Sequence, residues 1–157
     1  MIELLIQRVC KAPGIPADAK LRTWVEAALK GHRQHAEITL RLADSRESQQ
    51  LNLCYRHKDQ PTNVLAFPAD YDLPVGVSAQ LRAELENKLG DLVICVPLVA
   101  VEAEQQGKPL EQHWAHLVIH GCLHLLGFDH LNDKQAEAME TLEIKILATL
   151  GIPNPYQ

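Results

Sequence analysis

Three histidines placed around one glycine constrain this chain more than any other feature of its sequence. The pattern H-x-x-x-H-x-x-G-x-x-H is formed by His120, His124, Gly127 and His130. On an α-helix, residues four apart lie on one face about 6 Å apart along the axis, so His120 and His124 point the same way. Gly127 can adopt the left-handed conformation that ends a helix, which allows His130 to return toward the pair. The pattern therefore predicts a helix, a sharp turn and three imidazoles at one point.

Three imidazoles at one point are the ligand set of a catalytic zinc site. Three protein ligands leave a tetrahedral ion one open position for water, whereas a structural zinc site is closed by four protein ligands. We therefore expect His120, His124 and His130 to bind one Zn²⁺ ion, although another divalent metal would also suit three histidines. The alternative is a helix that carries core and surface histidines without a metal.

Four further residues in or near the motif bear on its function. His116 lies about 12 Å along a straight helix from His124, too far to bind the same ion. It is a partner of a ligand, a proton carrier, or a core or interface histidine. Asp129 is the nearest carboxylate, and either orients a ligand and moves protons or caps a turn. His113 is offset from the ligand face and is expected to be a surface or structural residue. Gly121 stands where a zinc protease of this spacing has its general-base Glu, which counts against peptide hydrolysis.

The cysteines indicate the compartment rather than the metal. Cys10, Cys54, Cys95 and Cys122 form no C-x-x-C pair, and each lies in an apolar stretch. We therefore expect free thiols in a reducing cytoplasm and no cysteine-ligated zinc. No apolar run approaches the roughly 20 residues that span a bilayer, and the N-terminus does not resemble a signal peptide.

The rest of the sequence alternates between strand-like and helix-like segments. Apolar runs and alternation predict strands over 2–9, 38–42, 63–67 and 91–96. Helical periodicity, with Pro, Asp or Asn at the start, predicts helices over 16–31, 44–56, 97–107, 109–127 and 132–150. Residues 69–88 are polar and mixed, which indicates a long loop with room for a short helical piece. This order predicts a single domain over residues 1–157 of the α/β (α+β) class, a small mixed four-stranded sheet flanked by about five helices.

Three segments resemble a known family. They are HWAHLVIHGCLHLLGFDH from His113, LNLCYRHKDQPTNVLAFP from Leu51 and LGDLVICV from Leu89. Together they resemble the YbeY family of bacterial metal-dependent endoribonucleases, which are ribosomal RNA maturation factors. The similarity extends from about Ile38 to Leu150, and the histidine motif is its most specific part.

The resemblance implies a fold, a metal site and an activity. It implies a single α/β domain, zinc on His120, His124 and His130, and cleavage of single-stranded RNA in 16S rRNA 3′ end maturation, rRNA processing and ribosome quality control. The implied partners are ribosomal RNA, the small ribosomal subunit and ribosome-assembly proteins, with no membrane and no DNA.

The resemblance also assigns Arg56 a role. The arginine of the family falls on Arg56, whose guanidinium could donate two hydrogen bonds to a phosphoryl oxygen pair. Without the resemblance, an arginine at a helix C-terminus is explained by the helix dipole. Thr62 and Asn63 would then fix the strand edge near the site. The candidate catalytic residues are thus Arg56, Asp129 and His116.

Charge distribution qualifies the RNA interpretation without excluding it. The formal net charge is −5, but residues 1–58 hold 10 Lys+Arg and 6 Asp+Glu, whereas residues 59–157 hold 5 and 14. This distribution predicts weak, salt-sensitive and locally guided binding of RNA. Two other functions stay open at this point: a zinc protease-like hydrolase, and a ribosome-assembly factor whose metal is mainly structural.

Overall fold

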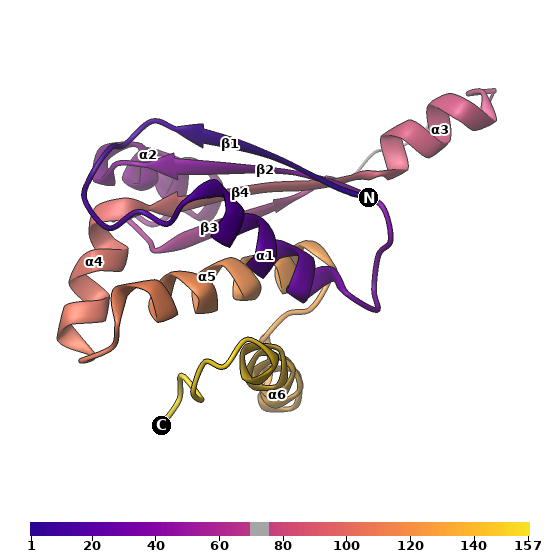
Figure 1. Cartoon of the computed structure of the whole chain (residues 1–157). Helices are drawn as coiled ribbons and strands as arrows, with labels where there is room; N and C mark the ends of the chain where they lie inside the picture. Colours follow the sequence, from indigo (N-terminus) through magenta and orange to yellow (C-terminus); the bar gives the residue numbers. More distant parts are fainter. Residues whose placement is uncertain (70–75) are drawn as a thin grey trace.

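One mixed sheet organises the chain. The computed structural model describes residues 1–69 and 76–157, and its four strands are arranged in the order β1-β2-β4-β3 (Figure 1). Strands β1 (Ile2–Arg8), β2 (Ala36–Ala43) and β4 (Lys88–Cys95) are parallel, and β3 (Val64–Pro68) is antiparallel to β4. The predicted α/β class with a small mixed four-stranded sheet is therefore confirmed.

The helices are distributed unequally over the two faces of the sheet. α5 (Leu110–Leu125) contacts β3, β4 and three other helices, and α6 (Asp133–Thr149) covers its outer side (Figure 1). α1 (Asp18–Leu29) and α4 (Val96–Gln105) flank α5 on the same face, while α2 (Ser45–Arg56) contacts β4 and α4. Because α5 is enclosed by the sheet and by other helices, it is apolar on most sides, with Trp114, Val118, Ile119 and Cys122 fully or almost fully buried.

Strand alternation explains why the core has a large and a small part. On β2, Ile38, Leu40 and Leu42 point to the α5 face and join the main core. Leu65 and Val93 point to the opposite face, where they form a second, smaller cluster with Ala43 against the α2 side chain of Leu51. The α5 face therefore supplies most of the hydrophobic stabilisation.

Local capping determines several helix boundaries. The Asp44 side chain accepts a hydrogen bond from Glu47 N at 2.8 Å, and the Asn132 side chain accepts one from Gln135 N at 2.9 Å. These caps begin α2 and α6 at the predicted places. α1 begins two residues after the predicted Pro16, and α4 begins at Val96, where the sequence predicts the last residue of a strand.

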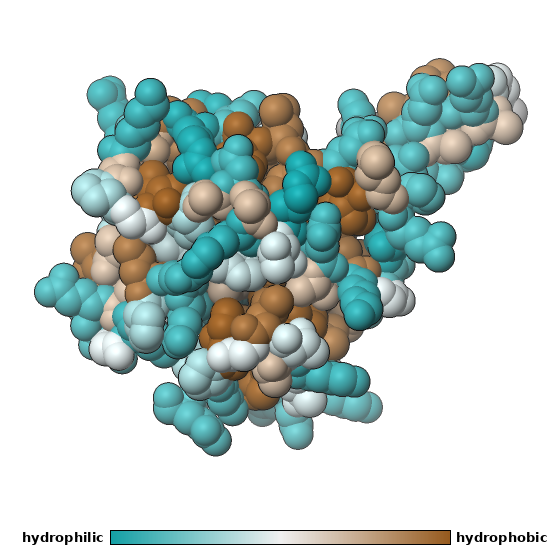
Figure 2. Space-filling model, viewed as in Figure 1, coloured by the Kyte–Doolittle hydropathy of each residue, from teal (hydrophilic) through white to brown (hydrophobic). Residues whose placement is uncertain are grey.

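The segment predicted as a long loop over 69–88 contains the short helical piece for which the sequence left room, but its C-terminal boundary is wrong. Residues 79–86 form α3 (Ala79–Glu86), and β4 begins at Lys88 rather than at Asp91. α3 buries none of its residues and projects from the body of the molecule with mostly hydrophilic side chains (Figures 1 and 2), so it lacks the apolar periodicity that reveals a helix. Residues 70–75 of the predicted loop lie outside the described residues.

In the ranges 1–69 and 76–157, each helix is either too short or too polar to cross a membrane.

Gly90 lies at a point in the sheet that has no room for a side chain. Its φ is +147°, and a Cβ there would lie 2.4 Å from the Phe67 carbonyl oxygen and 2.8 Å from Leu125 Cδ2. β2 and β4 shift register next to this residue, between Glu37 and Ile38. Gly90 therefore allows β3 and α5 to approach β4 closely.

We expect Gly90→Ala to lower the free energy of unfolding by about 2–4 kcal/mol, because it adds both backbone strain and overpacking. Gly107→Ala is the matched control. Gly107 also has a positive φ, +65°, but a Cβ there meets no atom within 4 Å, so we expect it to cost about 1 kcal/mol. Urea denaturation of both variants measures the difference, and equal losses would contradict this role of Gly90.

Candidate metal centre

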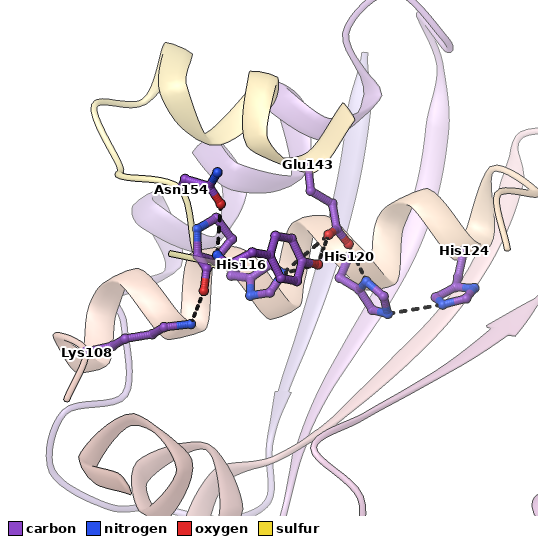
Figure 3. Close-up of polar contacts among 8 residues, drawn as sticks. Lys108, His116, His120, His124, Glu143 and Asn154 are labelled. Atoms are coloured by element: carbon purple, nitrogen blue, oxygen red, sulfur yellow. Dashed lines mark hydrogen bonds and ion pairs between the residues drawn. The ribbon is translucent and has the colours of Figure 1, made fainter. Parts of the chain in front are cut away.

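The end of α5 brings the three predicted ligands together. One nitrogen from each of His120, His124 and His130 lies within 4.8 Å of the other two. His120 Nε2 and His124 Nε2 are 3.1 Å apart (Figure 3). α5 ends at Leu125, and Gly127 has a φ of +103°, so the chain turns back as the motif predicts. The ring centroid of His130 lies 5.7 Å from that of His120 and 5.0 Å from that of His124.

The donor geometry of this cluster fits a tetrahedral metal ion. Two nitrogens bound to one tetrahedral zinc lie about 3.3 Å apart when each bond is about 2.05 Å, close to the observed separation of the two Nε2 atoms. The three histidines could therefore hold an ion such as Zn²⁺. Without an ion, the same separation allows a hydrogen bond in which one Nε2–H donates to the other Nε2.

Glu143 on α6 determines which nitrogen of His120 faces that position. The carboxylate is fully buried and accepts hydrogen bonds from His120 Nδ1 and from the Tyr156 hydroxyl, and His116 Nε2 lies 3.4 Å from it (Figure 3). An ionised carboxylate only accepts, so His120 Nδ1 carries the proton and Nε2 keeps its lone pair. A carboxylate that orients a histidine in this way is a common partner of metal ligands.

Hydrogen bonding keeps this buried carboxylate ionised. Burial alone would raise the pKa of Glu143, but the hydrogen bonds from His116 and His120 outweigh it and lower the pKa to about 2. The pKa of Tyr156 is raised, first by burial and then by its hydrogen bond to Glu143. The Tyr156 hydroxyl thus stays protonated and donates a hydrogen bond to Glu143.

The C-terminal segment places Tyr156 over Glu143. Lys108 Nζ donates to the Pro155 carbonyl at 2.5 Å, and the Asn154 side chain accepts from Tyr156 N at 2.8 Å (Figure 3). The Tyr156 ring packs edge-on against His116 with a centroid distance of 5.3 Å. These contacts tie the segment after α6 to the start of α5.

His124 is neutral at physiological pH. Burial lowers its pKa most, and repulsion from His120 and His130 lowers it further, to about 4. A neutral imidazole has the free lone pair that a metal ligand needs.

Arg56 lies across a cavity from the histidines. The cavity has a volume of about 250 Å³, and the metal-ligand candidates line it together with Arg56, Lys58, Thr62 and Asn63. Among its described lining residues there are two cationic side chains and no carboxylate. The site therefore suits an anionic ligand.

A left-handed residue and two buried side chains direct the loop that follows Arg56. His57 ends α2 with a φ of +60°. Ser48 Oγ donates to the Thr62 carbonyl at 2.9 Å and accepts from Thr62 N at 3.0 Å, and Asn52 Nδ2 donates to the Gln60 carbonyl at 2.8 Å. These bonds fold the loop back along α2 and hold its end against the cavity. The sequence interpretation missed both side chains, although two small polar residues four apart on the inner side of a helix are a usable signal.

Asn63 is anchored behind the cavity by a second carboxylate. Asn63 Nδ2 donates to Glu102 at 3.2 Å, and His113 Nε2 lies 3.0 Å from the same carboxylate. Burial raises the pKa of Glu102, but the hydrogen bonds from His113 and Asn63 lower it by more. His113 is only 4% exposed, so of its two predicted placements the structural one holds and the surface one is wrong.

Two candidate catalytic residues lie outside the cavity lining. His116 faces Glu143 and Tyr156 behind the ligand candidate His120 (Figure 3). The Asp129 carboxylate accepts from the backbone N–H of His130 at 2.7 Å, a local turn contact, and its charge offsets part of the lowering of the His124 pKa. Glu143 itself was not predicted, although a charged residue between Met139 and Leu147 on the buried face of α6 is a signal for it.

Close packing around Gly121 leaves no room for the general-base Glu that a zinc protease has at this position. A Cβ at this position would lie 2.8 Å from Leu92 Cδ2 and 3.3 Å from Val64 Cγ2. Because α5 packs this closely on β3 and β4, a Glu general base cannot enter here without displacing the core.

Comparison with known proteins identifies the family. The family model described as Endoribonuclease YbeY matches residues 10–151. The chain is 53% identical over 161 residues to Endoribonuclease YbeY of Pseudomonas putida, with 99% of this chain and 94% of that protein covered. It is 52% identical over 155 residues to Endoribonuclease YbeY of Stenotrophomonas maltophilia, with 99% and 93% covered.

Among solved structures, the fold is similar to the solution structure of TM1509 from Thermotoga maritima, with a TM-score of 0.57 and 23% identity. That match covers 96% of this chain and 92% of the other. At this identity the likeness concerns the fold alone. The family match and the identities above 50% establish that the chain belongs to the Endoribonuclease YbeY family.

Proposed function

We propose that residues 1–157 form one catalytic domain, a zinc-dependent endoribonuclease that hydrolyses single-stranded RNA. The observation that carries the proposal is the cavity in which three histidines face Arg56 and Lys58 with no carboxylate among its described lining residues. Phosphodiester cleavage needs stabilisation of negative charge, which such a lining supplies. The endoribonuclease names of the relatives support the same activity.

The donor set supports Zn²⁺ as the ion. His120, His124 and His130 would hold it, with Glu143 and Asp129 fixing the orientation of His120 and the turn before His130. A bound Zn²⁺ would act as a Lewis acid toward a phosphoryl oxygen and lower the pKa of water.

The side chains across the cavity bind and orient the RNA backbone. The Arg56 guanidinium donates hydrogen bonds to the non-bridging oxygens as their charge increases, and the Lys58 ammonium attracts the neighbouring phosphate. Asp129, whose carboxylate lies next to His130, is the group proposed to accept and pass on a proton there. His116 acts through Glu143 as a positioning residue, because it lies behind His120 rather than in the cavity.

Peptide hydrolysis is not favoured by any feature of this cavity. Gly121 occupies the position of the protease base, and no described residue of the cavity lining carries a carboxylate that could replace it. We propose instead that the chain acts in the cytoplasm on ribosomal RNA, in 16S rRNA 3′ end maturation and ribosome quality control, together with the small subunit and its assembly proteins. The basic excess of residues 1–58 supports this substrate.

Substitutions can separate the role of a metal ligand from that of the carboxylate that orients it. We expect His124→Ala to lose bound zinc and to lower RNA cleavage at least about a hundredfold, because it removes a ligand. We expect Glu143→Gln to weaken zinc affinity about 10–100-fold, because it removes the charge that fixes His120. Metal analysis, competition with a chelating dye and cleavage of a labelled RNA measure these effects.

Glu137→Gln is the control for Glu143, since Glu137 lies on the exposed side of α6. It should keep wild-type zinc affinity. Full RNA cleavage by metal-free His124→Ala protein would contradict the metal assignment, and wild-type zinc affinity in Glu143→Gln would contradict the orienting role.

Arg56 can be tested for stabilising the charge that develops on the phosphoryl oxygens. We expect Arg56→Ala to retain bound zinc and to lower kcat/KM for RNA about 10²–10³-fold. Arg46→Ala is the matched control, because Arg46 is exposed on the same helix and does not line the cavity. Unchanged turnover in Arg56→Ala, with intact zinc content, would return Arg56 to a helix-capping role.

A further inference from the structure

One edge of β3 faces the cavity. β3 is the last strand of the sheet, and within residues 1–69 and 76–157 only β4 pairs with it. Val64, Leu65 and Ala66 line the same cavity as His120, His124 and Arg56. A strand edge next to a candidate catalytic centre presents backbone donors and acceptors to whatever enters.

The hydrogen-bond pattern shows which backbone groups these are. Cys95 N donates to the Asn63 carbonyl at 2.9 Å, and Ala69 N donates to the Leu89 carbonyl at 3.0 Å. In an antiparallel pair the direction alternates from residue to residue, so residues 63, 65, 67 and 69 point to β4. Val64 and Ala66 therefore point their N–H and C=O groups to the free edge.

Most of the free edge is already satisfied or lacks a donor. Val64 N donates to the Asn63 side chain at 2.7 Å, and Pro68 has no N–H. Ala66 is thus the one β3 residue that offers both an N–H and a C=O to the cavity, with the Val64 carbonyl as a further acceptor. Because the two groups belong to one extended residue, they lie side by side and point the same way.

We propose that Ala66 binds the Watson–Crick edge of one unpaired nucleobase of the RNA substrate. Every base has an adjacent donor and acceptor on that edge, either a ring nitrogen beside an amine or an N–H beside a carbonyl. The Ala66 N–H and C=O complement both arrangements, because turning the base over by 180° exchanges the positions of its donor and acceptor. The inference rests on the proposed function and names the group that positions the substrate.

Charge favours RNA over an extended peptide as the occupant of this edge. A peptide could also pair with Ala66 as an added strand. The cavity next to it, however, carries Arg56 and Lys58 and no carboxylate among the described lining residues. A phosphate bound by these cations leaves its base free to turn toward β3, whereas a neutral peptide gains nothing from them.

The edge also explains a selectivity for single strands. In a duplex, the Watson–Crick edge is occupied by the complementary base, so Ala66 has no groups to bind. Base identity matters little, since all four bases satisfy the pair. The strand edge therefore discriminates by pairing state rather than by sequence.

The test compares one amide in the protein with one edge in the RNA. The Ala66 residue is replaced by lactic acid, which exchanges its N–H for an ester oxygen and keeps the side chain. Ala19 receives the same replacement as a control, because it is exposed in the first turn of α1, where an N–H has no helical acceptor. The substrates are a single-stranded RNA, its duplex, and versions with 3-methyluridine (edge blocked) or 5-methyluridine (edge free) at each position around the cleavage site.

We expect the Ala66 ester to lower kcat/KM about tenfold and the Ala19 ester to leave it unchanged. 3-Methyluridine at one position should cause a similar loss with the wild-type protein and little further loss with the Ala66 ester, while 5-methyluridine should cause none. Equal cleavage by both ester proteins, or equal cleavage of all single-stranded RNAs, would overturn the proposal.

Binding is measured separately from cleavage with ¹⁵N-alanine-labelled protein. The Ala66 amide signal should shift on addition of the single-stranded RNA and stay in place with the duplex or the edge-blocked RNA. A shift with the single-stranded RNA supports this proposal even if the wild-type protein cleaves no RNA, a result that would reject only the proposed activity. A shift with an extended peptide but not with RNA would overturn the proposal and assign the edge to peptides.

Discussion

The buried carboxylate of Glu143 is the interaction on which the site depends. An isolated charge in this position would cost several kcal/mol, and three donors from α5 and the C-terminal segment offset that cost. In return, the carboxylate fixes the tautomer of His120 and joins α6 to α5. The arrangement of the three histidines is therefore a property of the packed helices and not of the motif alone.

The side of the cavity that carries Arg56 is held by backbone conformation and neutral hydrogen bonds rather than by a buried charge. On this side the backbone carries the geometry, since a left-handed residue ends α2 and two buried polar side chains, Ser48 and Asn52, direct the following loop. Gly121 lets α5 pack directly on β3 and β4, so the histidines and the strand edge line one cavity. The close packing at Gly121 thus leaves no room for the general-base Glu of a zinc protease, and it brings α5 near to β3.

Sequence reasoning succeeded where the signal was local. The four-residue spacing of His120 and His124, the turn at Gly127 and the caps at Asp44 and Asn132 each depend on a few adjacent residues, and the structure has them all. It failed where tertiary packing decides. Glu143 comes from a different helix, and α3, which has no buried face, could be predicted only as a short helical piece without bounds. His113 was ambiguous because its partner, Glu102, belongs to α4.

The central claim is that His120, His124 and His130 hold one zinc ion oriented by Glu143. X-ray absorption at the zinc edge, on protein purified without a histidine tag, tests it most directly. We predict about one zinc per chain, with three imidazole nitrogens and one further light ligand at about 2.0–2.1 Å. A sulfur ligand at about 2.3 Å, or protein that retains no metal after expression in zinc-supplied medium, would contradict the account.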